Sequence, residues 1–164
     1  MQIRRPAVFF IAAALLFAPA VTRAPQVPQT YGAPITLDSA KKVIAAAEAE
    51  AKKNNLTMVI TIVDSGGNVV ALERMDGTQY GSLRVADGKA KSALDFRRSS
   101  KVLEDGLAAG GIGMRFLSVP EVVMIEGGEL LVAGDKIVGA IGVSGGSAVQ
   151  DGQIARAGVA ALGK

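Results

Sequence analysis

The stretch GGELLVAGDKIVGAIGVSGGSAVQDGQIARAGVAAL, residues 127–162, decides how this chain of 164 residues folds. Its segment 137–143 is apolar at nearly every position, which predicts a strand covered on both faces in the middle of a sheet. Gly139 and Gly142 interrupt the strand, and glycine inside a central strand indicates that a backbone or a ligand approaches closely. We therefore expect the rest of the domain to pack around this strand.

The predicted strand runs into Ser144-Gly145-Gly146-Ser147 and then into a helix expected from Gln153 to Leu162. A glycine loop before a helix is suited to bind an anion, because backbone N–H groups point outward there. The chain has neither a G-x-G-x-x-G nor a P-loop pattern, so nucleotide binding is not predicted. Two interpretations stay open, a tight turn with Asp151 as the helix cap or a loop that contacts a ligand.

The composition excludes several classes of function. Hydrophobic residues make up 49% of the chain, which is enough for one domain with one core. The absence of cysteine excludes disulfides, thiolate metal sites and a cysteine nucleophile. The absence of histidine removes the commonest general base and haem ligand, so serine–histidine and zinc hydrolysis are excluded.

Residues 1–24 have the pattern of a signal peptide, with Arg4 and Arg5 before the apolar run 7–17. Small residues allow cleavage after Ala20 or after residue 24, and we favour Ala20 because proline would follow the second site. We expect residues 25–34 to form a mobile proline-containing arm, residues 35–164 to form the domain, and the mature protein to be periplasmic or secreted. Without the signal the net charge of +3 falls to about zero, which leaves no basic face for nucleic acid.

Local patterns predict the remaining elements. Thr36 should cap a first helix, and the runs 58–63 and 69–72 should form a β-hairpin around a turn at residues 64–68. Ser82 should cap a second helix that reaches about residue 97, and the serines at 99 and 100 should begin a third helix over 101–108. A flexible glycine loop at 110–113 and strands at 122–126, 129–133 and from 137 should follow. This order predicts an α+β domain with an antiparallel sheet and helices on its faces.

Two places carry candidate site residues. Arg74-Met75-Asp76 leaves the hairpin with a cation and an anion on one face, which fits either a turn anchor or, with Tyr80 nearby, a ligand contact. Lys89 lies in the middle of the second predicted helix. An ordinary surface lysine is the simpler interpretation, and a lysine turned toward a pocket could bind a carboxylate or act as a base.

Three motifs together resemble the GlcG/HbpS family, namely VDSGGNVVALERMDG at 63–77, KAKSAL at 89–94 and GDKIVGAIGVSGG followed by QDGQIARAGVAAL. This family is also described as the haem-degrading domain family and occurs as the C-terminal domain of PduO-type corrinoid adenosyltransferases. The resemblance implies a profilin-like five-stranded antiparallel sheet of order 2-1-5-4-3, helices on both faces and assembly into homo-oligomers. It also implies haem as a possible cofactor, since members are described as binding or degrading haem.

The chain departs from the family pattern at residues relevant to haem. The histidines by which PduO-type domains hold haem iron have no counterpart here. Ser99-Ser100 stands where family members usually carry Pro-Thr or Pro-Ser, and Gly127-Gly128-Glu129-Leu130 stands where they carry a GG-x-P motif. Any axial ligand would have to come from Met75, Met114, Tyr80 or the Ser100 hydroxyl.

The leading hypothesis is an exported protein that binds haem or a related tetrapyrrole between segment 74–76, the second helix and the loop 144–151. The candidate ligand-binding residues are Arg74, Met75, Asp76, Lys89, Ser100, Ser144, Gly145, Gly146 and Asp151. In this hypothesis Arg74 or Lys89 pairs with the propionates. The alternative is an enzyme that acts on a small hydroxy-acid or carbonyl metabolite in the same pocket, with Lys89 and Asp76 as acid and base. A structural subunit whose glycines serve packing is a third possibility, and none of the three needs a protein-bound metal site.

Overall fold

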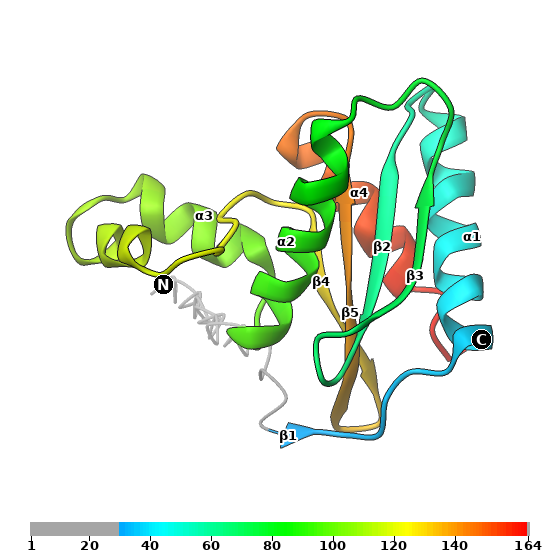
Figure 1. The fold of residues 1–164 in the computed structure, drawn as a ribbon, viewed down its shortest axis with the longest axis horizontal. Helices are drawn as coiled ribbons and strands as arrows, with labels where there is room; N and C mark the ends of the chain where they lie inside the picture. Colours follow the sequence, from blue (N-terminus) through cyan, green and yellow to red (C-terminus); the bar gives the residue numbers. More distant parts are fainter. Residues whose placement is uncertain (1–29, 164) are drawn as a thin grey trace, which may run out of the picture.

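The strand β5 (Lys136–Ser144) lies in the middle of a five-stranded sheet, as its apolar sequence predicts. The computed structural model describes residues 30–163. β5 pairs antiparallel with β2 (Val59–Asp64) on one side and with β4 (Gly128–Ala133) on the other. β2 in turn pairs antiparallel with β3 (Val69–Arg74). The α+β class with helices on both faces of the sheet is confirmed (Figure 1).

The strand order differs in one detail from the expected 2-1-5-4-3. The antiparallel strands follow β3-β2-β5-β4, which is the expected order without its outer strand. Residues 122–126 were expected to form that strand, and this prediction is wrong because side chains satisfy their backbone groups. Ser92 Oγ accepts from the N–H of Val123 at 2.8 Å, and Ser100 Oγ donates to the carbonyl of Ile125 at 2.7 Å.

The fifth strand is β1 (Thr30–Tyr31), which belongs to the proline-containing arm predicted to be mobile. It pairs parallel with the start of β5, and the Tyr31 hydroxyl donates to the carbonyl of Leu94 at 3.0 Å. This part of the arm is therefore held in the sheet. The expected signal peptide and the rest of the arm lie outside the described residues.

Helices form a layer on each face of the sheet (Figure 1). α1 (Leu37–Lys53), capped by Thr36 as predicted, lies with α4 (Ala148–Val159) on one face, and α2 (Gly81–Asp95) lies on the other. The larger apolar core lies under α1 and α4 and includes Val43, Ile60, Ile141 and Ile154. Under α2 the packing is very close, because a Cβ at Gly142 would stand 1.9 Å from the carbonyl oxygen of Ala86. This confirms the close approach that the strand glycines predict.

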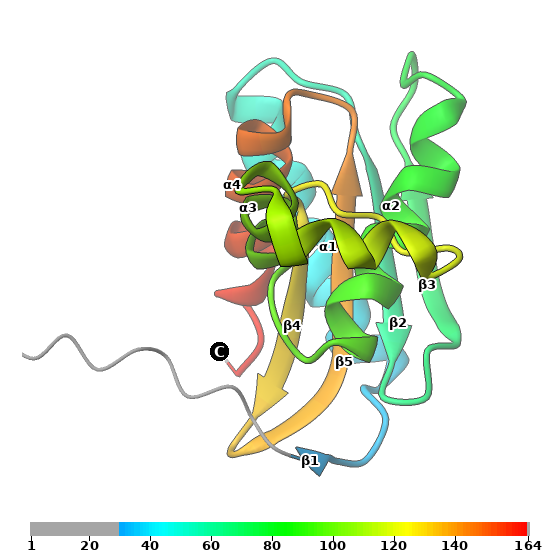
Figure 2. The same ribbon diagram turned by 90° about the vertical axis from the view of Figure 1, so that its left-hand side faces the viewer.

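α3 (Ser100–Ala108) and the 3-10 helix η1 (Gly111–Ser118) form an arm that projects from the α2 side of the sheet (Figures 1 and 2). Ser99 caps α3, and its Oγ accepts from the N–H of Lys101 at 3.2 Å. The flexible loop expected at 110–113 is instead the start of η1. Within residues 30–163 no helix has both the length and the apolar character needed to cross a bilayer.

Candidate functional site

Lys89, a residue of α2, has its side chain in the interior between α2 and the sheet. The interpretation of Lys89 as a surface lysine is therefore wrong. Its side chain is 1% exposed, and its Nζ lies 2.6 Å from Asp151 Oδ2 and 3.1 Å from the carbonyl oxygen of Val143. Space for the ammonium group exists because Gly127 has no side chain, and a Cβ there would stand 2.9 Å from Nζ. Through these two contacts Lys89 connects its own helix α2 to β5 and to α4 in the interior of the domain.

Asp151 is the partner of Lys89 and does not cap α4. Ser147 caps this helix in a capping box with Gln150, which places Asp151 in the first turn. Its Oδ1 accepts from the N–H of Gly146 at 2.9 Å. Burial raises the pKa of the Asp151 carboxyl, and the Lys89 ammonium and the N–H groups of Gly145 and Gly146 oppose this rise. The glycine loop predicted to bind an anion therefore binds a carboxylate of its own chain.

Two further candidate residues contribute to internal hydrogen bonds. Ser144 Oγ lies 3.1 Å from Ser82 Oγ, and both residues are buried. Ser82 lies within α2 and does not cap it, and the N-cap residue Tyr80 makes no side-chain cap. Ser100 is also buried, and its Oγ accepts from the N–H of Gly128 at 2.8 Å while donating to Ile125. Its hydroxyl is thus engaged within the fold.

Segment 74–76 lies at the end of β3, at the same end of the sheet as Ser144. Arg74 and Ser144 both stand opposite Val59 across neighbouring strands, which puts their Cα atoms about 10 Å apart. The guanidinium carbon of Arg74 lies 5.2 Å from the centre of the Tyr80 ring, within the range of a cation–π contact. Met75 Sδ accepts from the N–H of Met58 at 3.4 Å, and Asp76 is exposed in the turn. The structure pairs Lys89 with Asp151 and not with Asp76.

The outer face of α2 carries a hollow that the sequence did not reveal. It has a volume of about 410 Å³ and is lined by Arg84, Asp87, Gly88, Lys91, Glu121 and Val123. Tyr80 lies on the same stripe of the helix, because positions 80, 84, 88 and 91 fall within one face at 3.6 residues per turn. Gly88 allows the loop that follows η1 to approach α2 closely, since a Cβ there would stand 2.4 Å from Val123 Cγ2.

The charges of this hollow are of both signs. Lys91 Nζ lies 2.8 Å from Asp87 Oδ2, and Arg84 is exposed beside them. For Arg84, Asp87 and Lys91, the sequence signal is their helical spacing on the side of α2 opposite its buried stripe. Among residues 30–163 there is no group of three or more histidine, cysteine, aspartate or glutamate side chains arranged to hold a metal ion.

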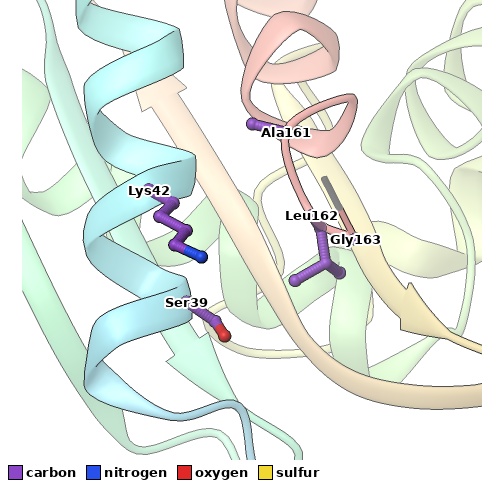
Figure 3. A pocket seen from close by; sticks show the side chains of 5 residues that line it. All are labelled: Ser39, Lys42, Ala161, Leu162 and Gly163. Carbon is purple, nitrogen blue, oxygen red and sulfur yellow. The ribbon is translucent and has the colours of Figure 1, made fainter.

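Two smaller hollows lie on the opposite face. One, of about 190 Å³, lies between α1 and the end of the chain, where Ser39 and Lys42 face Leu162 (Figure 3). The other, of about 290 Å³, lies between α1 and β3 and includes Ile44, Glu48 and Glu73. Neither contains a residue predicted from the sequence to be functional.

Comparison with known proteins shows which family this chain resembles. The model of the HbpS-like family, described as haem degrading protein HbpS-like, matches residues 35–160. Protein GlcG of Escherichia coli K12 is 38% identical over 105 residues, which is 64% of this chain and 77% of GlcG. An uncharacterized 15.0 kDa protein of Citrobacter freundii is 35% identical over 121 residues, which is 73% of this chain and 85% of the relative.

Solved structures agree with the sequence relatives. A double mutant of Streptomyces reticuli HbpS superposes with a TM-score of 0.74 at 32% identity, covering 90% of this chain and 99% of that one. A PduOC complex with haem superposes with a TM-score of 0.72 at 26% identity, covering 79% of this chain and 96% of that one. The family match over most of the domain, together with these relatives, shows that the chain belongs to the HbpS-like family.

Proposed function

We propose that this protein binds haem or a related tetrapyrrole on the outer face of α2. The observation that carries the proposal is its membership of the HbpS-like family, supported by the similar PduOC domain in complex with haem. The hollow beside Gly88 has about 410 Å³, within the range of about 300–1,000 Å³ usual for small-molecule sites. Lys89 is buried and paired with Asp151, so we do not assign it to an acid–base pair with Asp76.

Three side chains in or near the hollow match chemical groups of haem. Arg84 lines the hollow, and Arg74 contacts the ring of Tyr80, which lies one helical turn before Arg84, so we assign both arginines to the propionates. Tyr80 exposes 79% of its surface and can offer a phenol oxygen, one of the known protein ligands of haem iron. When bound, haem supplies a redox-active iron, whose properties depend on the axial ligand. The protein's own part is to hold the propionates and the ring.

Three candidate groups have other roles in the fold. Lys89 is engaged by Asp151, the Ser100 hydroxyl by Ile125 and Gly128, and the Met75 sulfur by Met58. We therefore assign propionate binding to the arginines and not to Lys89. Among the four possible axial ligands, Tyr80 and Met114 remain exposed, and only Tyr80 lies on the stripe of α2 that lines the hollow.

Titration of haemin and of iron-free protoporphyrin, followed by absorbance, tests this proposal. Arg84→Ala and Arg74→Ala should each weaken both ligands about three- to tenfold, between the effects of an exposed ion pair and a buried charge-assisted hydrogen bond. Tyr80→Phe keeps the ring and removes the phenol oxygen, so it should weaken haemin alone. Lys42→Ala, on the opposite face, is the control (Figure 3). Equal affinity in all five proteins would refute this site, and no Soret change in the wild type would refute haem binding.

The proposal also includes export and assembly into homo-oligomers. Export is supported by Arg4, Arg5 and the apolar run 7–17, which together have the pattern of a cleaved signal. Mature protein should begin at residue 21 or 25. N-terminal sequencing of the protein from the periplasm or medium checks this, and a mature protein that begins at Met1 would contradict it.

A further inference from the structure

Four aspartates of this chain are each followed directly by a glycine. The pairs are Asp76-Gly77, Asp87-Gly88, Asp105-Gly106 and Asp151-Gly152. In such a pair the backbone nitrogen of the glycine can attack the side-chain carboxyl of the aspartate, because glycine has no Cβ to hinder the approach. The attack closes a five-membered succinimide ring, which water opens again. The four pairs look alike in the sequence, and the structure separates them.

Three of the four glycines lie inside helices, where the backbone nitrogen is protected. Gly88 lies within α2, Gly106 within α3 and Gly152 within α4. In an α-helix each of these N–H groups donates to the carbonyl four residues earlier. The helix must therefore open locally before the nitrogen can react. Asp151 is in addition buried and paired with Lys89.

The Asp76-Gly77 pair lies instead in the exposed connection from β3 to α2, at one end of the sheet (Figure 1). It forms the centre of a β-turn, in which the N–H of Thr78 donates to the carbonyl of Met75 at 3.2 Å. Gly77 has a φ of 80°, which is typical of a glycine at the third position of a type II turn. The hydrogen bond that closes the turn does not use the Gly77 N–H, so this nitrogen can react without the opening of a helix.

We propose that Asp76 is a site of spontaneous isomerisation to isoaspartate. The Gly77 nitrogen forms a bond to the side-chain carboxyl carbon of Asp76, and the proton of the nitrogen and the hydroxyl of the carboxyl leave together as water. Water then adds to one of the two carbonyls of the ring. Addition at the side-chain carbonyl restores aspartate, and addition at the main-chain carbonyl leaves Gly77 bonded to the former side-chain carbon. The reaction needs no oxidant, enzyme or cofactor and leaves the mass of the protein unchanged.

The modification changes the backbone of the turn. In isoaspartate the main chain runs through Cβ and Cγ of residue 76, so it gains one carbon, and the carboxylate moves to Cα. Thr78 anchors the turn, because it is buried and its Oγ1 donates to the carbonyl of Met75 at 2.8 Å. The added carbon therefore alters the spacing between Arg74 and Tyr80, which are in contact across the connection. The modification itself does not depend on haem binding.

Incubation of the protein in heavy-oxygen water at mildly acidic pH, where the carboxyl can leave as water, tests the proposal. Each passage through the ring adds one oxygen atom from the solvent, and mass spectrometry of peptides locates it. The Asp76 peptide should gain label at least about tenfold faster than the Asp105 peptide, because the helix around Gly106 must first open. Asp105 is the matched control, since its side chain is 63% exposed and exposure alone would label both. Equal labelling of the two peptides would overturn the proposal.

Two substitutions sharpen the test. Asp76→Glu should stop labelling at residue 76, because the longer side chain would have to close a six-membered ring, which forms more slowly. Asp76→Asn should react faster at neutral pH, with loss of ammonia in place of water, while Asp105→Asn keeps its amide. A protease that cleaves before aspartate and not before isoaspartate measures the product. Label at Asp76 in a chain that this protease still cuts completely there would show a ring that reopens only to aspartate, and would also overturn the proposal.

Discussion

The interior beneath α2 and the α3–η1 arm hold the same pair of residue types in opposite settings. Beneath α2 the Lys89–Asp151 pair is 1% and 4% exposed and lies among glycines. On the arm the Lys101–Asp105 pair is 42% and 63% exposed, beside apolar side chains that also face outward. The first region places charge inside the fold and the second places apolar surface outside it.

The difference indicates what each region is for. A buried ion pair is stable only when its hydrogen-bonding capacity is met, and here Val143 and the glycine loop supply the remaining partners. The pair therefore fixes how α2, β5 and α4 meet. The exposed apolar side chains of the arm belong to neither apolar core of the domain.

Lys89→Met should give the largest loss of stability. It leaves the Asp151 carboxylate buried without its cation, which costs about 3–5 kcal/mol in the free energy of unfolding. Lys91→Met is the control in the same helix, because Lys91 is exposed and its ion pair with Asp87 is partly exposed too. Urea denaturation measures both. Similar midpoints for the two variants would show that the buried pair does not hold the domain together.

Gly142→Ala should have the next largest effect. The added Cβ would stand 1.9 Å from the Ala86 carbonyl oxygen, so α2 must move away from β5, at about 1–3 kcal/mol. A Cβ at Gly81 would meet nothing within 4 Å, so Gly81→Ala should change stability little. If the Gly142 variant unfolded at the wild-type urea concentration, the close packing beneath α2 would not be a source of stability.

Of the two residues in these predictions, the role of one could be predicted from the sequence and that of the other could not. Gly142 was identifiable, because a glycine in an apolar strand indicates close packing. The burial of Lys89 was not, because its partner lies 62 positions away and a lysine on a helix gives no sign of which way it turns. The hairpin and α1 were predicted because their patterns are local, with the Thr36 cap and the alternation from β2 to β3.

The segment 122–126 shows the opposite limit of sequence analysis. Its apolar residues predicted a strand, yet Ser92, Ser100 and Glu104 bind its backbone groups from distant positions. Such side-chain competition for backbone groups has no local signature. The hollow on α2 was missed for a related reason, because it needs the loop at Glu121 and Val123 to approach Gly88.

Gly113→Ala should disturb the arm without unfolding the domain. The added Cβ would stand 1.8 Å from the Gly106 carbonyl oxygen, so the arm must open locally, which limits the loss to under about 1 kcal/mol in global unfolding. Gly106→Ala is the control, because a Cβ there meets nothing within 4 Å outside its own helix. Urea denaturation of both variants and the wild type checks this, and a loss as large as that of Gly142→Ala would contradict it.

Lys101→Met should have the smallest effect, although it removes the same charge as Lys89→Met. The pair with Asp105 is an exposed contact one helical turn apart, which water and salt screen. The hydrogen bond that Lys101 donates to the Asp105 carboxylate raises the pKa of Lys101 above its usual 10.5. Stabilisation by a lysine with a raised pKa is complete below the usual value and is lost as the pH rises through the folded value. At pH 7 the Lys101–Asp105 ion pair is therefore fully formed. An unchanged urea midpoint of Lys101→Met at this pH would show that the pair adds nothing measurable to the stability of the fold. If Lys101→Met destabilised the fold as much as Lys89→Met, burial would not be what distinguishes the two pairs.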